Sequence, residues 1–349
     1  MNLEKYMQRC IELAELGAGH VSPNPMVGSV VVHNDKIIGE GYHKQYGQNH
    51  AEVNAIRDVL NKVGEQGEHI LKESTIFVSL EPCAHFGKTP PCADLIIRHG
   101  IPKVVIGCPD PFEHVNGRGI EKLRAAGIEV FENVLREECE FLNRRFFTRV
   151  KKQRPYIILK WAQTRDHYFA PEGNKQKWIS SPLAKVLSHK WRSEEDAILV
   201  GKKTALIDNP QLNVREWPGR NPRRIVIDRN LELPENLHFF DQSQGTIVFN
   251  SKKTEIHDQI KYLEVEDFDH YLPQLISYQL YLMDIQSLII EGGAKTLDLF
   301  IKAGLWDEAR VFTSEEFWGK GIKAPEIKGR RIDKTKVGTD ALEIFVNQA

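Results

Sequence analysis

The sequence has little of what marks secreted, membrane-spanning or nucleic-acid-binding proteins. Only five of its 349 residues are cysteines, at positions 10, 83, 92, 108 and 139, and so few thiols in an odd number argue against a disulfide framework. No apolar run approaches the roughly 18 residues of a membrane-spanning helix, and 1-MNLEKYMQRC-10 lacks the apolar core of a signal peptide. Lys and Arg (47) balance Asp and Glu (48), so no overall field favours nucleic acid or anionic membranes. We therefore expect a cytoplasmic protein that binds neither, with cysteines that are reduced or bound to metal.

Other absences restrict the fold. There is no internal repeat, no low-complexity tract and no GxGxxG followed by an acidic residue about 20 positions later, so a repeat architecture and a Rossmann domain are disfavoured. The length exceeds what one core usually supports, and at about 150 residues per domain it predicts two domains.

The first half shows helix and strand patterns in alternation. Apolar residues from Leu3 to Ala14 recur at helical spacing, and a strand at 26–32 turns at Asn34-Asp35 into 36–39. Further helices are expected from Ala51 and at 92–100 and 119–127, and further strands at 75–80, 103–107 and 128–132. This β-α-β alternation predicts a partly parallel sheet.

The second half predicts a further α/β domain. The charged run 150-VKKQRP-155 is interpreted as a solvated linker. Strands are expected at 156–162, 197–201, 224–228, 246–250 and 287–293, with helical stretches between several of them. We place the two domains at residues 1–147 and 148–349.

Three residues of the first half have the chemistry of zinc ligands. Cys83 and Cys92 lie in 81-EPCAHFGKTPPC-92, and His50 lies in 50-HAE-52. Catalytic zinc takes three such ligands and keeps a fourth position for water. Glu52 is suited to carry protons from that water to a leaving amine. His50 and Cys92 are expected at helix starts, where the helix dipole and free amides would favour a thiolate.

Two alternatives use the same residues. A structural zinc would need a fourth ligand, which only His85 or Cys108 offers nearby. A zinc-stabilised interaction module without enzymatic activity predicts that Glu52 can be replaced without functional loss.

The spacing narrows the choice among deaminases. Zinc nucleobase deaminases carry H-x-E and P-C-x-x-C, whereas eight residues separate Cys83 from Cys92 here. This longer form, with 23-PNPMVG-28, 39-GEGYH-43, 47-GQNHAEV-53 and 117-GRG-119, resembles the deaminase domain of the bifunctional riboflavin-biosynthesis deaminase and reductase over residues 1 to 147.

The resemblance implies a cytidine-deaminase-like fold and a phosphorylated pyrimidine substrate. The expected reaction is hydrolytic removal of the 2-amino group from 2,5-diamino-6-ribosylamino-4(3H)-pyrimidinone 5′-phosphate. By the same resemblance Asn24 and His43 line the base pocket, and His85, Lys88 and Asp110 lie near the substrate. The family usually has arginine where Lys88 stands, which keeps the charge but loses the bidentate fork.

The stretch 289-IIEGGAKTLDLF-300 suits phosphate binding, because it places two glycines between a strand and a helix start. With 159-LKWAQTRD-166, 178-WISSP-182, 196-DAILVGKKTALIDNPQLNVR-215 and 223-RRIVID-228, it resembles the reductase half of the same family, whose domain resembles dihydrofolate reductase. The resemblance implies that NADPH delivers a hydride to C1′ of the ribosylamino group and opens the sugar to ribityl. We also expect a homo-oligomer formed through this domain.

Carried over residue by residue, the resemblance assigns two sets of contacts. The NADPH set is Ala162, Trp178, Thr204, Asp208, Arg229, Gly293, Ala294, Lys295, Thr296, Leu297, Asp298 and Leu299. The substrate set is Gln176, Arg192, Leu212, Arg215 and Glu291. Arg192 and Arg215 are expected to hold the phosphate, and Arg229 is a candidate ligand of the NADPH 2′-phosphate.

The second half departs further from the family pattern. His167 stands in place of glycine, which matters if the backbone there has positive φ, and Gln176 stands in place of serine. The usual Asp-Asp-Pro is Asp208-Asn209-Pro210. A chain with deaminase activity alone and a degenerate reductase domain therefore stays an alternative. So does a deaminase of nucleosides or of RNA or DNA bases, for which 144-RRFF-147 is the only basic and aromatic cluster.

Overall fold

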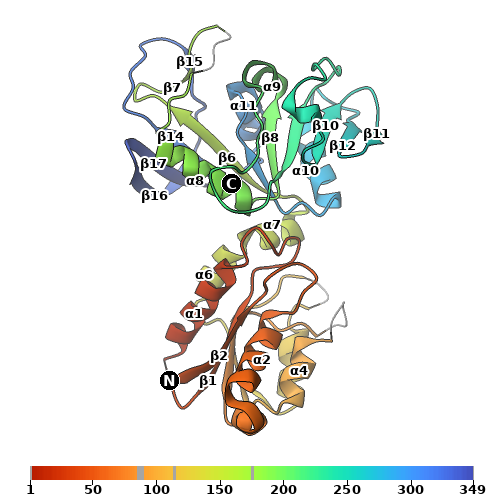
Figure 1. Cartoon of the computed structure of the whole chain (residues 1–349), viewed down its shortest axis with the longest axis vertical. Helices are drawn as coiled ribbons and strands as arrows, with labels where there is room; N and C mark the ends of the chain where they lie inside the picture. Colours follow the sequence, from red (N-terminus) through yellow and green to blue (C-terminus); the bar gives the residue numbers. More distant parts are fainter. Residues whose placement is uncertain (1, 85–89, 113–114, 174–176, 349) are drawn as a thin grey trace. The chain divides into compact units, whose positions relative to one another are not determined.

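The computed structural model of the chain describes residues 2–84, 90–112, 115–173 and 177–348 (Figure 1). It divides into two compact units, Met1–Lys152 and Gln153–Ala349, each with its own sheet and cores. None of the helices among the described residues is long and apolar enough to cross a membrane.

The N-terminal unit holds one sheet and helices on both of its faces. Its helices are α1 (Leu3–Glu15), α2 (Ala51–Val63), α3 (Gly67–Leu71), α4 (Cys92–Arg98), α5 (Arg118–Ala125), α6 (Arg136–Leu142), α7 (Arg144–Lys152) and the 3₁₀ turn η1 (Gly64–Gln66). Its strands are β1 (Gly28–His33), β2 (Lys36–Tyr42), β3 (Thr75–Leu80), β4 (Lys103–Cys108) and β5 (Glu129–Phe131).

The sheet has the order β2-β1-β3-β4-β5. Strand β1 is antiparallel to β2 and β3, whereas β3, β4 and β5 are parallel. The β1–β2 turn is formed by Asn34 and Asp35 at φ 49° and 57°, the left-handed conformation that tight hairpins need. Helices α1 and α6 cover one face of the sheet, and α2 and α4 cover the other (Figure 1). A separate apolar core therefore lies on each face of the sheet. The carboxyl ends of the parallel strands thus share one edge, near the starts of α4 and α5.

The C-terminal unit is larger and its sheet is mostly parallel. Its helices are α8 (Pro182–Glu194), α9 (Lys202–Asp208), α10 (Leu272–Leu282), α11 (Ala294–Lys302) and the 3₁₀ turn η2 (His238–Phe240). Its strands are β6 (Tyr156–Gln163), β7 (Tyr168–Ala170), β8 (Ala197–Gly201), β9 (Arg223–Ile227), β10 (Thr246–Asn250), β11 (Glu255–His257), β12 (Ile260–Glu264), β13 (Ser287–Ile290), β14 (Glu308–Thr313), β15 (Ile322–Lys323), β16 (Gly329–Val337) and β17 (Asp340–Asn347).

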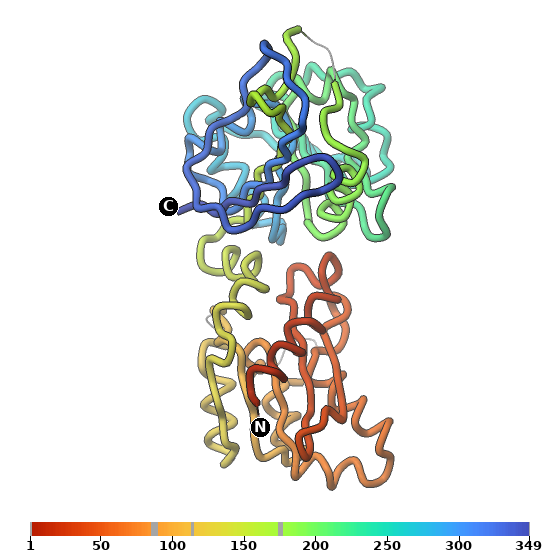
Figure 2. Tube along the Cα trace, turned by 90° about the vertical axis from the view of Figure 1, so that its left-hand side faces the viewer, coloured from red at the N-terminus to blue at the C-terminus, as the bar shows by residue number. Residues whose placement is uncertain are grey.

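Ten of these strands form one sheet in the order β11-β12-β10-β9-β8-β13-β6-β14-β17-β16. The seven strands from β12 to β14 in this order are parallel, and antiparallel β11, β17 and β16 extend the two ends. Figure 2 shows the last residues, in blue, as the β16–β17 hairpin. The central strands are buried apolar runs, as in β13 and β8, because helices cover them.

Most predicted elements are confirmed, but the expected strand at 287–293 ends at Ile290. The expected strand at 26–32 begins at Gly28. The β16–β17 hairpin was not predicted, because β16 is charged and exposed along most of its length and shows no alternation.

The linker prediction for 150–155 is confirmed only in part: the compact units divide within this run, after Lys152, but most of its residues are not solvated linker. Residues 150–152 continue helix α7, whose Phe146 and Phe147 are buried in the N-terminal core. Arg154 is only 11 % exposed and forms a bidentate ion pair with Asp307 of the C-terminal unit. The predicted boundary between 147 and 148 falls within α7, whereas the compact units divide after Lys152.

Candidate active sites

The three expected zinc ligands come together at the edge where β3 ends. His50 is the N-cap residue of α2, Cys92 is the first residue of α4, and Cys83 follows β3. Their ligand atoms all lie within 4.8 Å of one another. His50 Nδ1 is 3.2 Å from Cys92 Sγ and 3.6 Å from Cys83 Sγ. Ligands in a zinc tetrahedron stand about 3.5 Å apart, so this group fits the ion.

The surroundings of the two thiols shift their pKa values in opposite directions. The Cys92 thiol and the His50 ring lower the pKa of Cys83 to about 4, against the effect of burial. The Cys92 backbone N–H, at the start of α4, also donates to Cys83 Sγ at 3.3 Å. The neighbouring Cys83 and burial raise the pKa of Cys92. The amide at the start of α4 therefore supports a thiolate on Cys83, which adds to the expected effect of the helix start on Cys92.

Glu52 lies beside this group without being one of its three ligands. It is in the first turn of α2 and only 3 % exposed. Burial raises the pKa of Glu52, although the nearby His50 opposes that shift. A carboxyl group with a raised pKa takes up and returns protons near neutral pH more readily than an exposed glutamate.

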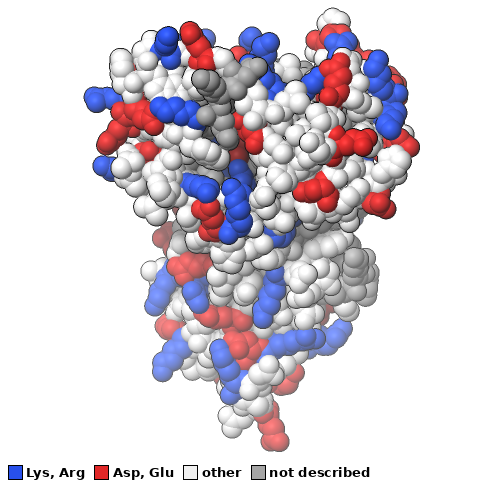
Figure 3. Space-filling view, turned by 45° about the horizontal axis from the view of Figure 1, so that its top comes forward, with Lys and Arg blue, Asp and Glu red and all other residues white. Residues whose placement is uncertain are grey.

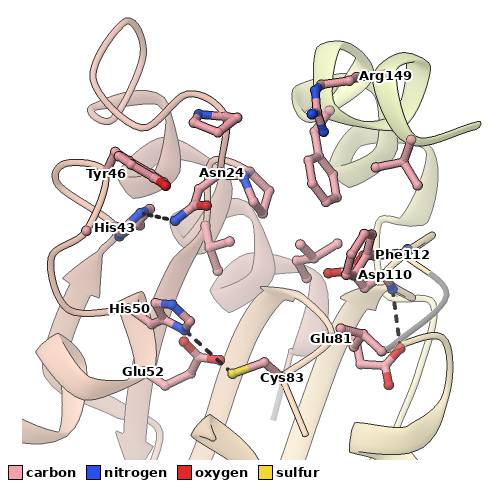
Figure 4. Close-up of a pocket in the computed structure, with 18 of the residues that line it drawn as sticks. Asn24, His43, Tyr46, His50, Glu52, Glu81, Cys83, Asp110, Phe112 and Arg149 are labelled. Carbon is pink, nitrogen blue, oxygen red and sulfur yellow. Dashed lines mark hydrogen bonds between the residues drawn. The ribbon is translucent and has the colours of Figure 1, made fainter. Parts of the chain in front are cut away.

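A pocket of about 360 Å³ opens onto these residues (Figure 4). His43 Nδ1 is 3.0 Å from the Asn49 carbonyl, which only accepts, so this nitrogen carries the proton. His43 Nε2 must then accept from the Asn24 amide nitrogen at 3.1 Å. Burial lowers the pKa of His43 and keeps the ring neutral. These bonds orient Asn24, and both expected base-pocket residues line the pocket with His50 and Glu52.

Asp110 also lines the pocket, as expected. Burial raises its pKa to about 7, and the neighbouring Glu81 adds to that shift. Glu81 accepts backbone N–H groups of Asp110, Gly117, Gly119 and Ile120, and so joins β3 to the start of α5. This contact explains the 117-GRG-119 stretch: Gly117 has φ 87°, and a Cβ on Gly119 would lie 2.0 Å from the Pro82 carbonyl oxygen. His85 and Lys88 lie outside the described residues.

The sequence did not indicate several of the residues that line the pocket. Tyr46 and Phe112 line it, and so do Phe146, Arg149 and Val150 of α7. The sequence singles out the cluster 144-RRFF-147 only as a basic and aromatic one and does not connect it with this pocket. The spacing of Phe146 and Val150 on one helix face was a usable signal, but the surrounding charges concealed it.

In the C-terminal unit, the expected substrate residues Arg192 and Glu291 form a buried ion pair. Arg192 donates to both Glu291 oxygens, at 3.1 and 2.7 Å, and the two side chains are 12 % and 10 % exposed. Burial would raise the pKa of Glu291, but Arg192 and Lys160 outweigh it and hold the pKa at about 2. Burial lowers the pKa of Lys160, which the sequence analysis did not single out. Figure 3 shows Lys and Arg side chains interspersed with Asp and Glu side chains over the surface of this unit.

Arg215 and Leu212 lie on the loop that passes this ion pair. Arg192 contacts the loop through the Asn213 carbonyl, and the Arg215 backbone N–H donates to His189 Nδ1. Burial lowers the pKa of His189 to about 4, and Arg192 and Arg215 lower it further, so the ring is a neutral acceptor. Leu212 is buried in the core. The loop thus holds Arg215, whose side chain is exposed, close to Arg192.

The expected NADPH loop is built by close backbone packing. A Cβ on Gly292 would lie 2.4 Å from Val200 Cα, and Gly293 has φ 39° at the N-terminus of α11. Thr204 Oγ1 would lie 3.2 Å from a Cβ on Gly293, and Thr296 faces Gly201. The structure therefore brings Thr204 and Thr296 beside the two glycines. Asp208 ends α9, and burial raises its pKa.

Other expected NADPH residues are more dispersed. Ala162 is on β6, and Trp178 is 65 % exposed. Arg229 forms a bidentate ion pair with Asp269, which competes with a role toward the 2′-phosphate. Gln176 lies outside the described residues.

His167 has φ 63°, so histidine stands where the backbone does favour glycine. Histidine tolerates this conformation better than most residues, and His167 is held by Gln163. Asn209 has φ 37°, which suits asparagine.

Comparison with known proteins agrees with the sites described in both units. Residues 1–108 match the cytidine and deoxycytidylate deaminase zinc-binding region, and residues 155–339 match the RibD C-terminal domain. The riboflavin biosynthesis protein RibD of Aquifex aeolicus is 40 % identical over 336 residues, 95 % of this chain and 92 % of that protein. RibD of Escherichia coli is 35 % identical over 341 residues, 93 % and 90 % of the two chains.

Solved structures give the same result. A diaminohydroxyphosphoribosylaminopyrimidine deaminase/5-amino-6-(5-phosphoribosylamino)uracil reductase from Thermotoga maritima has a TM-score of 0.90 and 38 % identity, with 99 % of this chain and 98 % of that chain covered. Acinetobacter baumannii RibD has a TM-score of 0.88 and 30 % identity, with 99 % of each chain covered.

The fold and the two sites define a zinc-dependent deaminase of the cytidine deaminase type, followed by an NADPH-dependent reductase related to dihydrofolate reductase. The chain belongs to the RibD family of bifunctional riboflavin biosynthesis enzymes.

Proposed function

We propose that the N-terminal unit deaminates 2,5-diamino-6-ribosylamino-4(3H)-pyrimidinone 5′-phosphate and that the C-terminal unit reduces the ribosyl group of the product to ribityl. The observation that carries the deaminase half is the convergence of His50, Cys83 and Cys92 within 4.8 Å, beside a buried Glu52 at the floor of one pocket. The full-length similarity to RibD proteins supports the order of the two reactions.

In the deaminase site, His50, Cys83 and Cys92 would hold zinc. When bound, the ion supplies a water molecule whose proton is lost near neutral pH. Glu52 takes that proton and returns it to the departing amine, so one C–N bond is replaced by a C–O bond and ammonia leaves. Its raised pKa suits both transfers. The Asn24 amide, oriented by His43, is positioned to contact the pyrimidine ring.

In the reductase site, NADPH supplies the hydride that reduces C1′. The loop from Gly293 to Leu299 and Thr204 would hold the cofactor, because Gly292 and Gly293 let the backbone come close at the start of α11. Arg192 and Arg215 would bind the substrate phosphate, and Glu291 keeps Arg192 in place.

The test is to supply purified protein with the diaminopyrimidinone ribosylamino phosphate, with and without NADPH. Ammonia should be released in both cases, and NADPH should be oxidised only after the ammonia appears. Ammonia release without NADPH oxidation would support the deaminase assignment and contradict the reductase assignment. Oxidation without ammonia would contradict the order.

The proposal also covers the location of the protein in the cell, its oligomeric state and its domain boundary. The chain would work in the cytoplasm, which its five unpaired cysteines support. It would form a homo-oligomer through the C-terminal unit, where edge strands β11 and β16 leave backbone groups for pairing. Light scattering tests the second point. The boundary between the deaminase and reductase domains, predicted after residue 147, would lie at the end of α7, where the compact units divide after Lys152.

A further inference from the structure

Arg149 is the only lysine or arginine among the described residues that line the deaminase pocket. It lies on α7, at the opposite end of the pocket from His50 and Cys83 (Figure 4). Sequence reasoning placed this stretch next to a linker and gave Arg149 no role. Its position therefore needs an explanation of its own.

The helix that carries Arg149 is fixed to the N-terminal unit. Phe146 and Phe147 of α7 are each 8 % exposed and pack into the same core as α1 and α6. Phe146 also forms part of the pocket wall, one helical turn from Arg149. The guanidinium is thus held at the pocket by packing within one unit.

The charges in the pocket change sign from one end to the other. Glu52, Glu81 and Asp110 lie toward the same end of the pocket as His50 and Cys83, whereas the described lining at the far end carries the guanidinium. A substrate phosphate has a charge of about −1.5 to −2 at pH 7. Carboxylates repel that charge, whereas a guanidinium can bind two phosphate oxygens at once.

The reacting ring carbon must lie next to Glu52, so the rest of the substrate extends away from the floor. We propose that Arg149 binds the 5′-phosphate of the deaminase substrate and makes this site select phosphorylated pyrimidines over their nucleoside forms. The inference rests on the proposed function, since it assigns a contact to that substrate. Phe112 and Tyr46 line the same pocket and offer ring faces for the base and sugar between the two ends.

The test measures ammonia release without NADPH from the phosphorylated substrate and from the same compound after removal of its phosphate. The readout is the KM for the dephosphorylated compound divided by the KM for the phosphorylated substrate. Loss of one charge-assisted contact should raise KM for the phosphorylated substrate about 10-fold to 100-fold in Arg149→Ala, and the ratio should fall by the same factor. Arg149→Lys should recover part of it, because lysine keeps the charge but not the fork.

Arg136→Ala is the matched control. Arg136 lies on α6, is exposed and pairs with Glu140, and it is not among the residues that line the pocket. This variant should leave the ratio unchanged. In wild-type protein, added salt should raise KM for the phosphorylated substrate more than for the dephosphorylated one, which tests the idea without any variant.

The outcomes separate the two proposals. If Arg149→Ala raises both KM values equally, or neither, and salt acts equally on both substrates, Arg149 is no phosphate ligand. If wild-type protein releases ammonia from neither compound, the deaminase substrate itself is wrong, and this inference fails with it.

Discussion

The two units of the chain hold their chemistry in different ways. In the N-terminal unit, the residues expected to react come from two short motifs and meet at helix starts beside the end of one strand. In the C-terminal unit, the central contact joins Arg192 and Glu291, which are 99 residues apart in the sequence. The first arrangement depends on local geometry and a metal, whereas the second depends on the packing of a whole parallel sheet. Substitutions in the N-terminal site should therefore mainly cost metal binding and activity, whereas substitutions in the C-terminal site should also cost stability.

The largest expected effect is loss of the metal. Cys83→Ser replaces a thiolate by a hydroxyl that does not ionise at neutral pH, so zinc content should fall from about one per chain to near zero. Ammonia release should fall with it, while NADPH oxidation with the deaminated intermediate should persist. Metal analysis with both assays checks this. Unchanged zinc would remove Cys83 from the ligand set.

Glu52→Gln should have the next largest effect. The amide keeps the shape of the side chain but carries no proton, so ammonia release should fall by about 100-fold or more with zinc retained. Glu65→Gln is a matched control, because Glu65 lies in the turn after α2 and is exposed. Near-normal turnover in Glu52→Gln would leave the zinc with a structural role.

In the C-terminal unit, Arg192→Met should abolish NADPH oxidation and destabilise the unit. Removing one partner of a buried ion pair costs up to about 3–5 kcal/mol, and the nearby Lys160 should offset part of that loss for Glu291. Urea unfolding of the variant, compared with ammonia release from the same sample, measures both effects. Normal stability in this variant would show that the pair is dispensable.

The same pair predicts a pH dependence with a definite sign. The pKa of Glu291 is held at about 2 in the folded chain, below its ordinary value of 4.5. The stabilisation is therefore complete above pH 4.5 and is lost as the pH falls toward 2. Arg192→Met should lose this part of the pH dependence.

The smallest effect is expected where the second unit begins. Arg154→Met removes the ion pair with Asp307, but Asp307 still accepts the Ile157 backbone N–H, so we expect a loss of about 2 kcal/mol. Arg331→Met removes an exposed pair with Glu343 and should cost less than about 0.5 kcal/mol. Thermal unfolding compares them, and equal losses would mean that Arg154 behaves as a solvated linker residue after all.

The same contrast decides what could be predicted from the sequence. Cys92 and His50 could be placed at helix starts, because the apolar periodicity of α4 and α2 begins beside them. The Arg192–Glu291 pair could not be derived from spacing, since nothing local joins residues that far apart. The family resemblance named both residues as substrate contacts, but it did not predict that they pair with each other.

Two incorrect predictions from the sequence arose because the charge of a segment pointed to a loop while the segment forms a helix or a strand. The linker was predicted to begin at residue 150 because the last turn of α7 is basic, although Phe146 and Phe147 fix this helix to the core. Strand β16 was not recognised because an exposed edge strand has no buried face to impose alternation. Both errors fall on charged segments, where composition outweighed periodicity.

The central claim is that the two sites are chemically separate, and one measurement addresses it directly. Glu52→Gln is supplied with the deaminated intermediate and NADPH, and NADPH oxidation is followed alongside the wild type. Equal rates are predicted, because Glu52 lines the pocket of the N-terminal unit, and the described lining of that pocket includes none of the residues assigned to the reductase. A rate that falls in parallel with ammonia release would contradict the account.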